Sequence, residues 1–420
     1  MTVLAGPLDR GALIDRYRRG RTRSAALFAS ISEEAHYEAP IPLRHPFVFY
    51  EGHLPAFAYL VLHERALGGG AIDARLETLF ERGIDPAGPD AAARHRRHDW
   101  PERAVVRDFA AACDAALIAD IAAARLDDPA NPLLADAQAL FTILEHEEMH
   151  QETLAYIINR LPLGSKHGDG GSVRDVAPAA RAPVAIGAGR ATLGRARGSG
   201  FGWDNEFGAA SVEVPAFGID AQNVTNGDFL AFVRAGGAAP PFWFRRDGAW
   251  WLHGAYADVP RPLSWPVYVS HDEAAAFCAW SGARLPSEAE YDRTAYGSPA
   301  GDERRFPWGA QSPGPQHGNF NFRRFDPEPV GSSPAGASAW GVEDLVGNGW
   351  EWTSTPFAPF AGFEPMASYP QYSADFFDGR HYVLKGASPV TSSNLVRRSF
   401  RNWFYADYPY MYATFRRVYD

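Results

Sequence analysis

The sequence predicts an α+β protein of two domains, a helical bundle followed by a loop-rich α+β domain. Its 420 residues exceed what one hydrophobic core usually serves. Apolar residues recur at helical spacing through residues 1–164. From Val184 onward, short apolar runs alternate with loops rich in Gly, Pro and Asn. This change of pattern within one chain predicts two different architectures.

The N-terminal domain, residues 1–164, is expected to be a four-helix bundle. Long helices joined by short connections favour an antiparallel bundle, in which sites form from inward-facing side chains. Pro162 and Gly164 should end the last helix. The segments with helical periodicity are Ala12–Ile31, Pro55–Arg65, Arg103–Ala124 and Asp136–Leu161.

Residues 165–183 are rich in Gly, Ala, Pro and charge without any period, which is typical of an interdomain linker. The second domain should then span residues 184–420. Helices are expected at Asn226–Ala235 and His271–Trp280, whereas the stretch Gly297–Ser338 shows no period. We therefore expect a compact domain with much irregular structure.

Composition limits the partners. A formal net charge of −10 argues against nucleic acid or an anionic membrane surface. The basic cluster Arg16–Arg23 lies in a helical pattern and is interpreted as a solvated face.

Cys113 and Cys278 are the only cysteines, so no disulfide framework follows and a reducing cytoplasm fits best. No stretch approaches the ~20 apolar residues of a membrane span. Small-molecule partners in the cytoplasm are expected.

The segment EHEEMHQE (145–152) carries the strongest chemical signal. His146 and His150 are four residues apart, so both imidazoles project from one helix face and can share a metal. The acidic residues around them could fix the imidazole tautomers. The segment also fits the H-E-x-x-H pattern of zinc hydrolases, in which Glu147 would be the general base. No further ligand follows at the usual downstream position.

A further ligand should therefore come from another helix. His53, expected to open the second helix amid aromatic residues, is the best candidate. Three neutral imidazoles leave open positions on an octahedral metal, which suits iron(II) and O2, although ligand type alone leaves zinc open. The weaker candidates are His45, His63, His95 and His98.

Several motifs resemble a known family. HPFVFYEGHLPAF (45–57) and EHEEMHQETLAYIINRLP (145–162) resemble the DinB-like domain of the sulfoxide synthases of ergothioneine and ovothiol biosynthesis. The C-terminal part resembles the formylglycine-generating-enzyme fold, a variant of the C-type-lectin fold. It does so through FGWDNE (201–206), VTNGDFLAFV (224–233), WPVYVS (265–270), ARLPSEAEYD (283–292), GNGWEWT (347–353) and RRSFRNW (397–403). The ordered set covers nearly the whole chain.

The resemblance implies a non-heme iron(II) enzyme that uses O2. Its metal ligands map onto His53, His146 and His150. The substrate would be hercynine, the trimethyl betaine of histidine, and a sulfur donor would be joined to the imidazole ring. Asn402 and Trp403 are the candidates for binding the betaine. A trimethylammonium group is attracted to aromatic faces such as that of Trp403.

The sequence departs from the family at the expected donor pocket. Phe404 stands where members that take γ-glutamylcysteine have Asp, and Tyr408-Pro409 stand in place of an arginine pair. A bidentate Arg clamp cannot be replaced by Tyr and Pro. With Tyr405, these residues predict a less charged donor, such as the selenosugar of the related selenoneine synthases. The alternative is an ergothioneine-type enzyme that uses a thiol, cysteine or γ-glutamylcysteine.

Two more departures concern catalysis. Met149 stands where ergothioneine-type members have Gln, and it cannot make the same hydrogen bonds to the substrate imidazole. The family's catalytic tyrosine is missing from its expected place, and Tyr369 and Tyr372 are the nearest substitutes, although either could be structural.

The sequence thus predicts a hercynine oxygenase that forms a C–Se or C–S bond. A zinc hydrolase, a thiol-dependent transferase of the DinB type and a non-enzymatic binding protein of lectin-like fold stay as alternatives.

Overall fold

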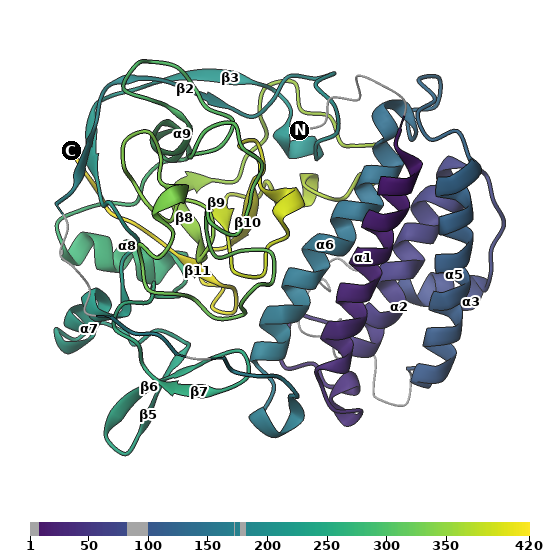
Figure 1. The fold of residues 1–420 in the computed structure, drawn as a ribbon, viewed down its shortest axis with the longest axis horizontal. Coiled ribbons are helices and arrows are strands. Elements are labelled where there is room, and N and C mark those ends of the chain that lie inside the picture. The colour runs from purple at the N-terminus through teal and green to yellow at the C-terminus, as the bar shows by residue number, and fades with distance from the viewer. Residues whose placement is uncertain (1–7, 82–99, 172, 177–181) are drawn as a thin grey trace. The chain divides into compact units, whose positions relative to one another are not determined.

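The computed structural model describes residues 8–81, 100–171, 173–176 and 182–420 of the chain (Figure 1). It divides into two compact units. The helical unit comprises Met1–Gly168 together with two short segments, Gly198–Phe201 and Met366–Tyr369. The mixed unit comprises Asp169–Arg197, Gly202–Pro365 and Pro370–Asp420. The segment Met366–Tyr369 matters for function because it brings a tyrosine from the C-terminal half of the sequence into the helical unit.

The helical unit is a bundle of helices, drawn purple to blue in Figure 1. Aspartates cap two of its helices, since Asp9 accepts from the Ala12 N–H and Asp73 accepts from the Leu76 N–H. A π-helical segment, Tyr59–Ala66, continues the second helix. The helices are α1 (Arg10–Ala29), α2 (Phe47–Ala58), α3 (Ala74–Phe80), α5 (Arg103–Ala123) and α6 (Gln138–Asn159).

The four predicted helices are all present, but the predicted start of the second is wrong. Apolar residues at helical spacing predict a helix from Pro55 to Arg65. Helix α2 instead begins at Phe47 and carries Pro55 in its interior. Every residue of α2 is buried, so packing on its neighbours outweighs the cost of the missing N–H. His53 consequently lies inside a rigid helix rather than at its end.

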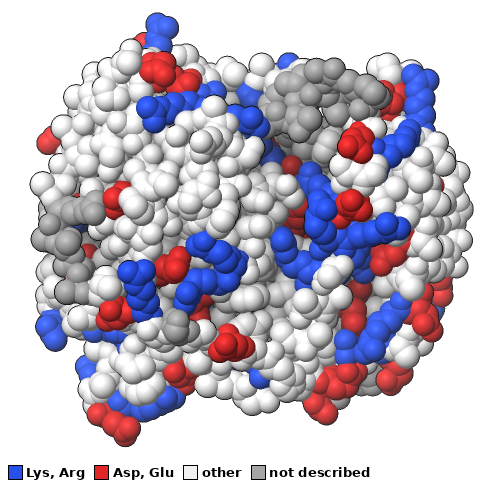
Figure 2. Space-filling model, in the orientation of Figure 1, with Lys and Arg blue, Asp and Glu red and all other residues white. Residues whose placement is uncertain are grey.

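The basic cluster of α1 is not simply a solvated face. Arg16 and Arg21 have side chains that are only 18% exposed, and each pairs with a carboxylate of α6. The expectation is therefore wrong for these two residues, because α1 packs along the acidic side of α6. Acidic and basic side chains accordingly lie side by side over the helical unit (Figure 2).

The mixed unit is built around a four-stranded sheet of order β10-β9-β8-β11. Its strands are Asn402–Tyr405, His381–Ala387, Gly349–Pro356 and Ala413–Thr414, respectively. Three smaller sheets accompany it. One consists of β1 (Val184–Ile186), β4 (Phe217–Ile219) and β12 (Val418–Tyr419), and a second of β2 (Gly189–Leu193) and β3 (Ala210–Val214). The third consists of β5 (Trp243–Arg246), β6 (Ala249–His253) and β7 (Asp258–Pro260). Large buried aromatics, including Trp203, Trp350 and Trp352, fill the core.

The helices of this unit are α7 (Asn226–Arg234), α8 (His271–Trp280) and α9 (Glu288–Tyr296). Helix α8 has the predicted ends and α7 ends one residue earlier than predicted. Helix α9 was not predicted, because its short charged sequence shows no clear apolar period. The signal that could have found it is the capping box formed by Ser287 and Glu290.

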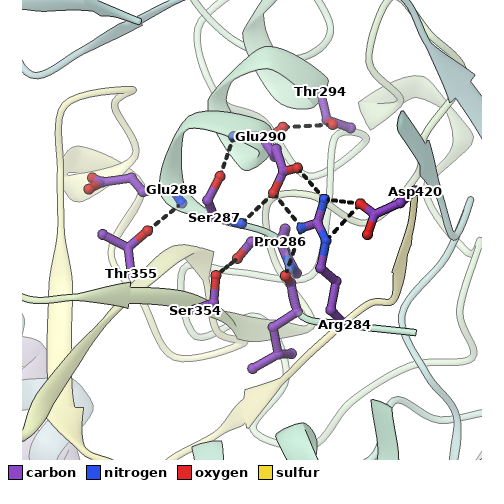
Figure 3. A network of polar contacts seen from close by, with 10 residues as sticks. Arg284, Pro286, Ser287, Glu288, Glu290, Thr294, Ser354, Thr355 and Asp420 are labelled. Atoms are coloured by element: carbon purple, nitrogen blue, oxygen red, sulfur yellow. Dashed lines mark hydrogen bonds and ion pairs between the residues drawn. The ribbon is translucent and has the colours of Figure 1, made fainter. Parts of the chain in front are cut away.

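A polar network fixes the start of α9 (Figure 3). Arg284 binds both carboxylate oxygens of Glu290, at 2.7 and 2.8 Å, and also binds Asp420. The Glu288 N–H donates to Thr355 of strand β8 at 2.9 Å. Helix α9 is therefore tied to the central sheet.

Two acidic side chains of α9 then reach the strands β9 and β10. Glu288 pairs with Arg401 at 3.0 Å, and Asp292 pairs with Lys385 at 3.3 Å. All four side chains are almost fully buried. Breaking a buried pair is costly, so these contacts hold β9 and the start of β10, which begins at Asn402, in place.

Within the described part of the chain, no helix is long and apolar enough to span a lipid bilayer.

Candidate metal centre

Three histidines converge inside the helical unit, of which His53 and His146 are buried and His150 is half-buried. His53 comes from α2, and His146 and His150 come from successive turns of α6. One ring nitrogen from each lies within 4.8 Å of those of the other two. The ring centroids of His53 are 5.1 Å from those of both His146 and His150, which are 4.4 Å apart. The structure thus brings together the residues that the sequence analysis selected as metal ligands.

The nitrogen atoms are in the right chemical state for a metal. The Nδ1–H of His53 donates to the Phe80 carbonyl at 2.7 Å, which leaves the lone pair on Nε2. Three buried ring nitrogens, His53 Nε2, His146 Nε2 and His150 Nδ1, have no hydrogen-bond partner among the described residues. Buried polar atoms are rarely left without a partner, so this set fits a bound cation.

Burial also favours the neutral imidazoles that metal binding requires. Desolvation lowers the pKa of His53 to about 4, although the Phe80 carbonyl opposes this. Desolvation and the neighbouring histidines lower the pKa values of His146 and His150 well below the usual range. All three rings therefore favour the neutral form, with one N–H and one lone pair each, at neutral pH.

Aromatic residues of α2 enclose the three imidazoles. Phe57 stacks on His146 with centroids 3.6 Å apart, and Phe49 stacks on His53 at 5.1 Å. Tyr50 lies 5.6 Å from His150. These rings restrict the orientation of each imidazole. The sequence showed that aromatics surround His53, but not which ring each would cover.

The acidic neighbours do not act as expected. Glu148 binds Arg16 in a bidentate pair at 2.9 and 3.1 Å. Glu147 binds Arg21 at 3.1 Å and accepts a hydrogen bond from Ser24. The prediction that these acids fix the imidazole tautomers is therefore wrong for both. The backbone carbonyl of Phe80 fixes the tautomer of His53. Because every residue has a carbonyl, the sequence carries no signal for this contact.

The weaker histidine candidates lie elsewhere or outside the description. The ring of His45 packs on Phe49 with centroids 4.1 Å apart. His63 pairs with Asp120 at 2.7 Å. His95 and His98 lie outside the described residues.

The two tyrosine candidates fall in different units. Tyr369 belongs to the helical unit, where its ring meets Phe57 edge-on at 5.0 Å and His146 at 6.1 Å. The neighbouring Ser368 shares a 2.9 Å hydrogen bond with Thr142 of α6, which anchors the segment. Tyr372 belongs to the mixed unit, where it stacks on Trp203 at 4.0 Å. Of the two tyrosines, only Tyr369 belongs to the unit that holds the three histidines, and it lies beside His146.

The other predicted binding residues lie in α6 and β10. Met149 is half-buried, one position before His150. Asn402 and Trp403 are also half-buried, and Trp403 lies parallel to Phe357 at 4.3 Å. Trp403 thus presents a ring that is already fixed in orientation.

The residues expected to contact the donor are aromatic neighbours of one another. Phe404 stacks on Tyr408 at 4.8 Å, and Tyr405 packs on His381 at 3.9 Å. A positive charge is also present, since Arg380 lies over the Tyr405 ring at 4.8 Å. Arg380 could not be found from the sequence, because nothing local in the sequence pairs it with Tyr405.

Comparison with known families matches both parts of the chain. The DinB superfamily matches residues 16–154. The sulfatase-modifying factor enzyme 1-like domain matches residues 172–420, more than half of the chain. The predicted fold class, a DinB-like bundle followed by a domain of the formylglycine-generating-enzyme type, is thereby confirmed.

Curated relatives point to one family. The chain is 34% identical to the hercynine oxygenase of Mycolicibacterium thermoresistibile over 68% of this chain and 70% of that protein. It is 37% identical to that of Mycolicibacterium smegmatis over 62% of this chain and 67% of that protein. It is 40% identical to that of Mycobacterium tuberculosis, where the match spans 51% of this chain and about half, 54%, of that protein. With a DinB domain and a sulfatase-modifying factor enzyme 1-like domain in one polypeptide, the chain belongs to the hercynine oxygenase family.

Proposed function

We propose that this protein is an iron(II)- and O2-dependent enzyme that joins a thiol donor to the imidazole ring of hercynine. The observation that carries the proposal is the convergence of His53, His146 and His150 in a member of this family. The reaction balances as hercynine C–H plus R–SH plus O2 giving a C–S(=O)–R sulfoxide and water. Carbon and sulfur are oxidised, and O2 takes up the four electrons.

His53, His146 and His150 would hold the metal through their unpartnered ring nitrogens. Iron(II) bound by three imidazoles would supply open positions for O2 and the donor's sulfur. The fixed His53 ring and the aromatic packing on α2 keep the ligand set rigid, as a second layer of contacts does in other metal sites.

Tyr369 is the proposed proton donor. Its ring packs against Phe57 and lies beside His146, so its hydroxyl can deliver a proton near the reacting atoms. Met149, beside His150 on α6, would offer the substrate imidazole an apolar contact in place of hydrogen bonds. Asn402 and Trp403 would hold the betaine, the ring through attraction of the trimethylammonium group.

A selenium donor is the second candidate. It is favoured by the aromatic surroundings of the predicted donor residues, where Phe404 and Tyr408 stack on each other. Aromatic faces and hydroxyl groups suit a sugar better than the carboxylates of γ-glutamylcysteine. Arg380 near Tyr405 weakens this argument, because a guanidinium could still bind a carboxylate.

Product analysis tests both candidates. The full-length protein, loaded with iron(II) under anaerobic conditions, is mixed with hercynine, O2 and one donor at a time: cysteine, γ-glutamylcysteine or a selenosugar. Mass spectrometry should find a sulfoxide adduct with a thiol donor. An adduct with the selenosugar alone would move the assignment to the second candidate. Absence of any hercynine adduct with all three donors would overturn the proposal.

The variant Glu147→Gln separates this function from that of an H-E-x-x-H hydrolase. Because Arg21 and Ser24 already hold the Glu147 carboxylate, its loss should lower the free energy of unfolding by about 1–3 kcal/mol. The rate of hercynine conversion should remain close to that of the wild type. Urea unfolding and product assays measure the two effects. Unchanged stability with lost activity would instead make Glu147 a catalytic base.

A further inference from the structure

A second pocket lies in the helical unit, apart from the candidate metal centre. It has a volume of about 520 Å³ and is bordered by α1, α2, α5 and the short helix Glu34–Tyr37. The three histidines of the metal centre are not among its lining residues. Pockets of 300–1,000 Å³ with a few convergent polar groups are typical of small-molecule sites.

The pocket has an open mouth and a polar floor. The exposed lining residues include three small ones, Ala25, Ala29 and Ala111, which mark the side of the pocket that faces solvent. The floor holds a buried ion pair in which Arg103 binds both oxygens of Glu51, at 2.8 and 2.9 Å. A buried charge pair on a pocket floor is costly to maintain unless it serves packing or a ligand.

The floor also has an unpartnered acceptor. His36 is 1% exposed, and its Nε2–H donates to the Phe28 carbonyl at 3.1 Å. The lone pair therefore sits on Nδ1, which has no hydrogen-bond partner among the described residues. This atom lies 3.7 Å from a carboxylate oxygen of Glu51. Two acceptors so close repel each other unless a group with at least two N–H or O–H donors, such as an ammonium, lies between them.

An unused donor lies on the other side of the same carboxylate. The guanidinium of Arg107, whose side chain is 56% exposed, is 3.6 Å from Glu51 and 3.9 Å from Glu33. Both distances are too long for hydrogen bonds, and the described residues offer it no closer partner. Its N–H groups can therefore bind the two oxygens of a carboxylate in a bidentate manner.

These features fit one class of ligand. We propose that this pocket binds a free α-amino acid with an apolar side chain. Its ammonium group would lie between His36 and Glu51, and its carboxylate would bind Arg107. Phe28 and Ile31, which also line the pocket, would contact the side chain. Hercynine does not fit this site, because its trimethylammonium group has no N–H to donate. The site is thus distinct from that of the proposed reaction.

Calorimetry on the full-length protein tests the proposal, with L-leucine and L-phenylalanine as probes. At least one of them should bind with one-to-one stoichiometry. Leucinamide lacks the carboxylate and N-acetyl-L-leucine lacks the ammonium group. Each should bind at least about tenfold more weakly than leucine, since each loses one charge-assisted contact.

Two variants place the binding in this pocket. Arg107→Gln should weaken binding at least about tenfold through loss of the bidentate contact, and Ala111→Leu should block the mouth and abolish binding. Arg125→Gln is the matched control, because Arg125 is an exposed arginine that, among the described residues, pairs with Asp128 at 3.6 Å and does not line the pocket. The proposal is overturned if neither amino acid binds, if the two analogues bind as well as leucine, or if Arg107→Gln has no effect. None of these results depends on iron or hercynine.

Discussion

Replacement of His150 by alanine should abolish hercynine conversion and lower the affinity for iron(II) by more than about a hundred-fold. Loss of a residue that only supports a metal ligand costs 10–100-fold in affinity, and loss of a ligand itself should cost more. The effect should be severe here because the other two imidazoles are held rigidly. His53 is fixed by the Phe80 carbonyl and His146 by the Phe57 ring, so neither can move to compensate.

The measurements are iron content after dialysis and O2 consumption with hercynine present. His63→Gln is the matched control, since His63 also lies in the helical unit but pairs with Asp120. The control should keep its iron and its activity. A His150→Ala variant that is folded, holds iron like the wild type and still converts hercynine would refute the ligand assignment.

Replacement of Tyr369 by phenylalanine should lower the rate of conversion by about 10²–10⁴-fold, the usual contribution of a positioned proton donor. The affinity for iron(II) should not change, because the ring that packs against Phe57 is kept and only the hydroxyl is removed. This split between binding and turnover is the signature of a residue that acts in the chemical step.

Tyr372→Phe provides the comparison within the same stretch of sequence. Tyr372 stacks on Trp203 and meets Trp403 edge-on at 5.1 Å, contacts that phenylalanine can also make. Its activity should stay near that of the wild type. If Tyr372→Phe loses activity and Tyr369→Phe does not, the roles assigned to the two tyrosines are wrong.

Several features of the site were predictable because they are local. The spacing of His146 and His150 places both rings on one face of any helix that contains them. The amphipathic period of the bundle helices was likewise visible along the chain. The start of α2 was not, because a proline is locally unfavourable inside a helix, whereas burial of the whole helix outweighs that cost.

The roles of the acidic residues show the same limit. Glu147 and Glu148 lie next to His146 in sequence, yet they turn toward Arg21 and Arg16 of α1. A helix separates adjacent residues by about 100° around its axis, so neighbours in sequence face different partners. Only the packing of α1 against α6 decides which partners those are.

The sequence by itself determined the two domains, the family and the three histidines, because these depend on residue type, spacing and order along the chain. The tertiary structure alone decided that His53 meets the two histidines of α6, that the Phe80 carbonyl sets its tautomer, and that Tyr369 rather than Tyr372 joins the helical unit. Each of these depends on contacts between residues far apart in the chain. Such contacts are selected by how whole elements bury their apolar surface, and no local pattern records that.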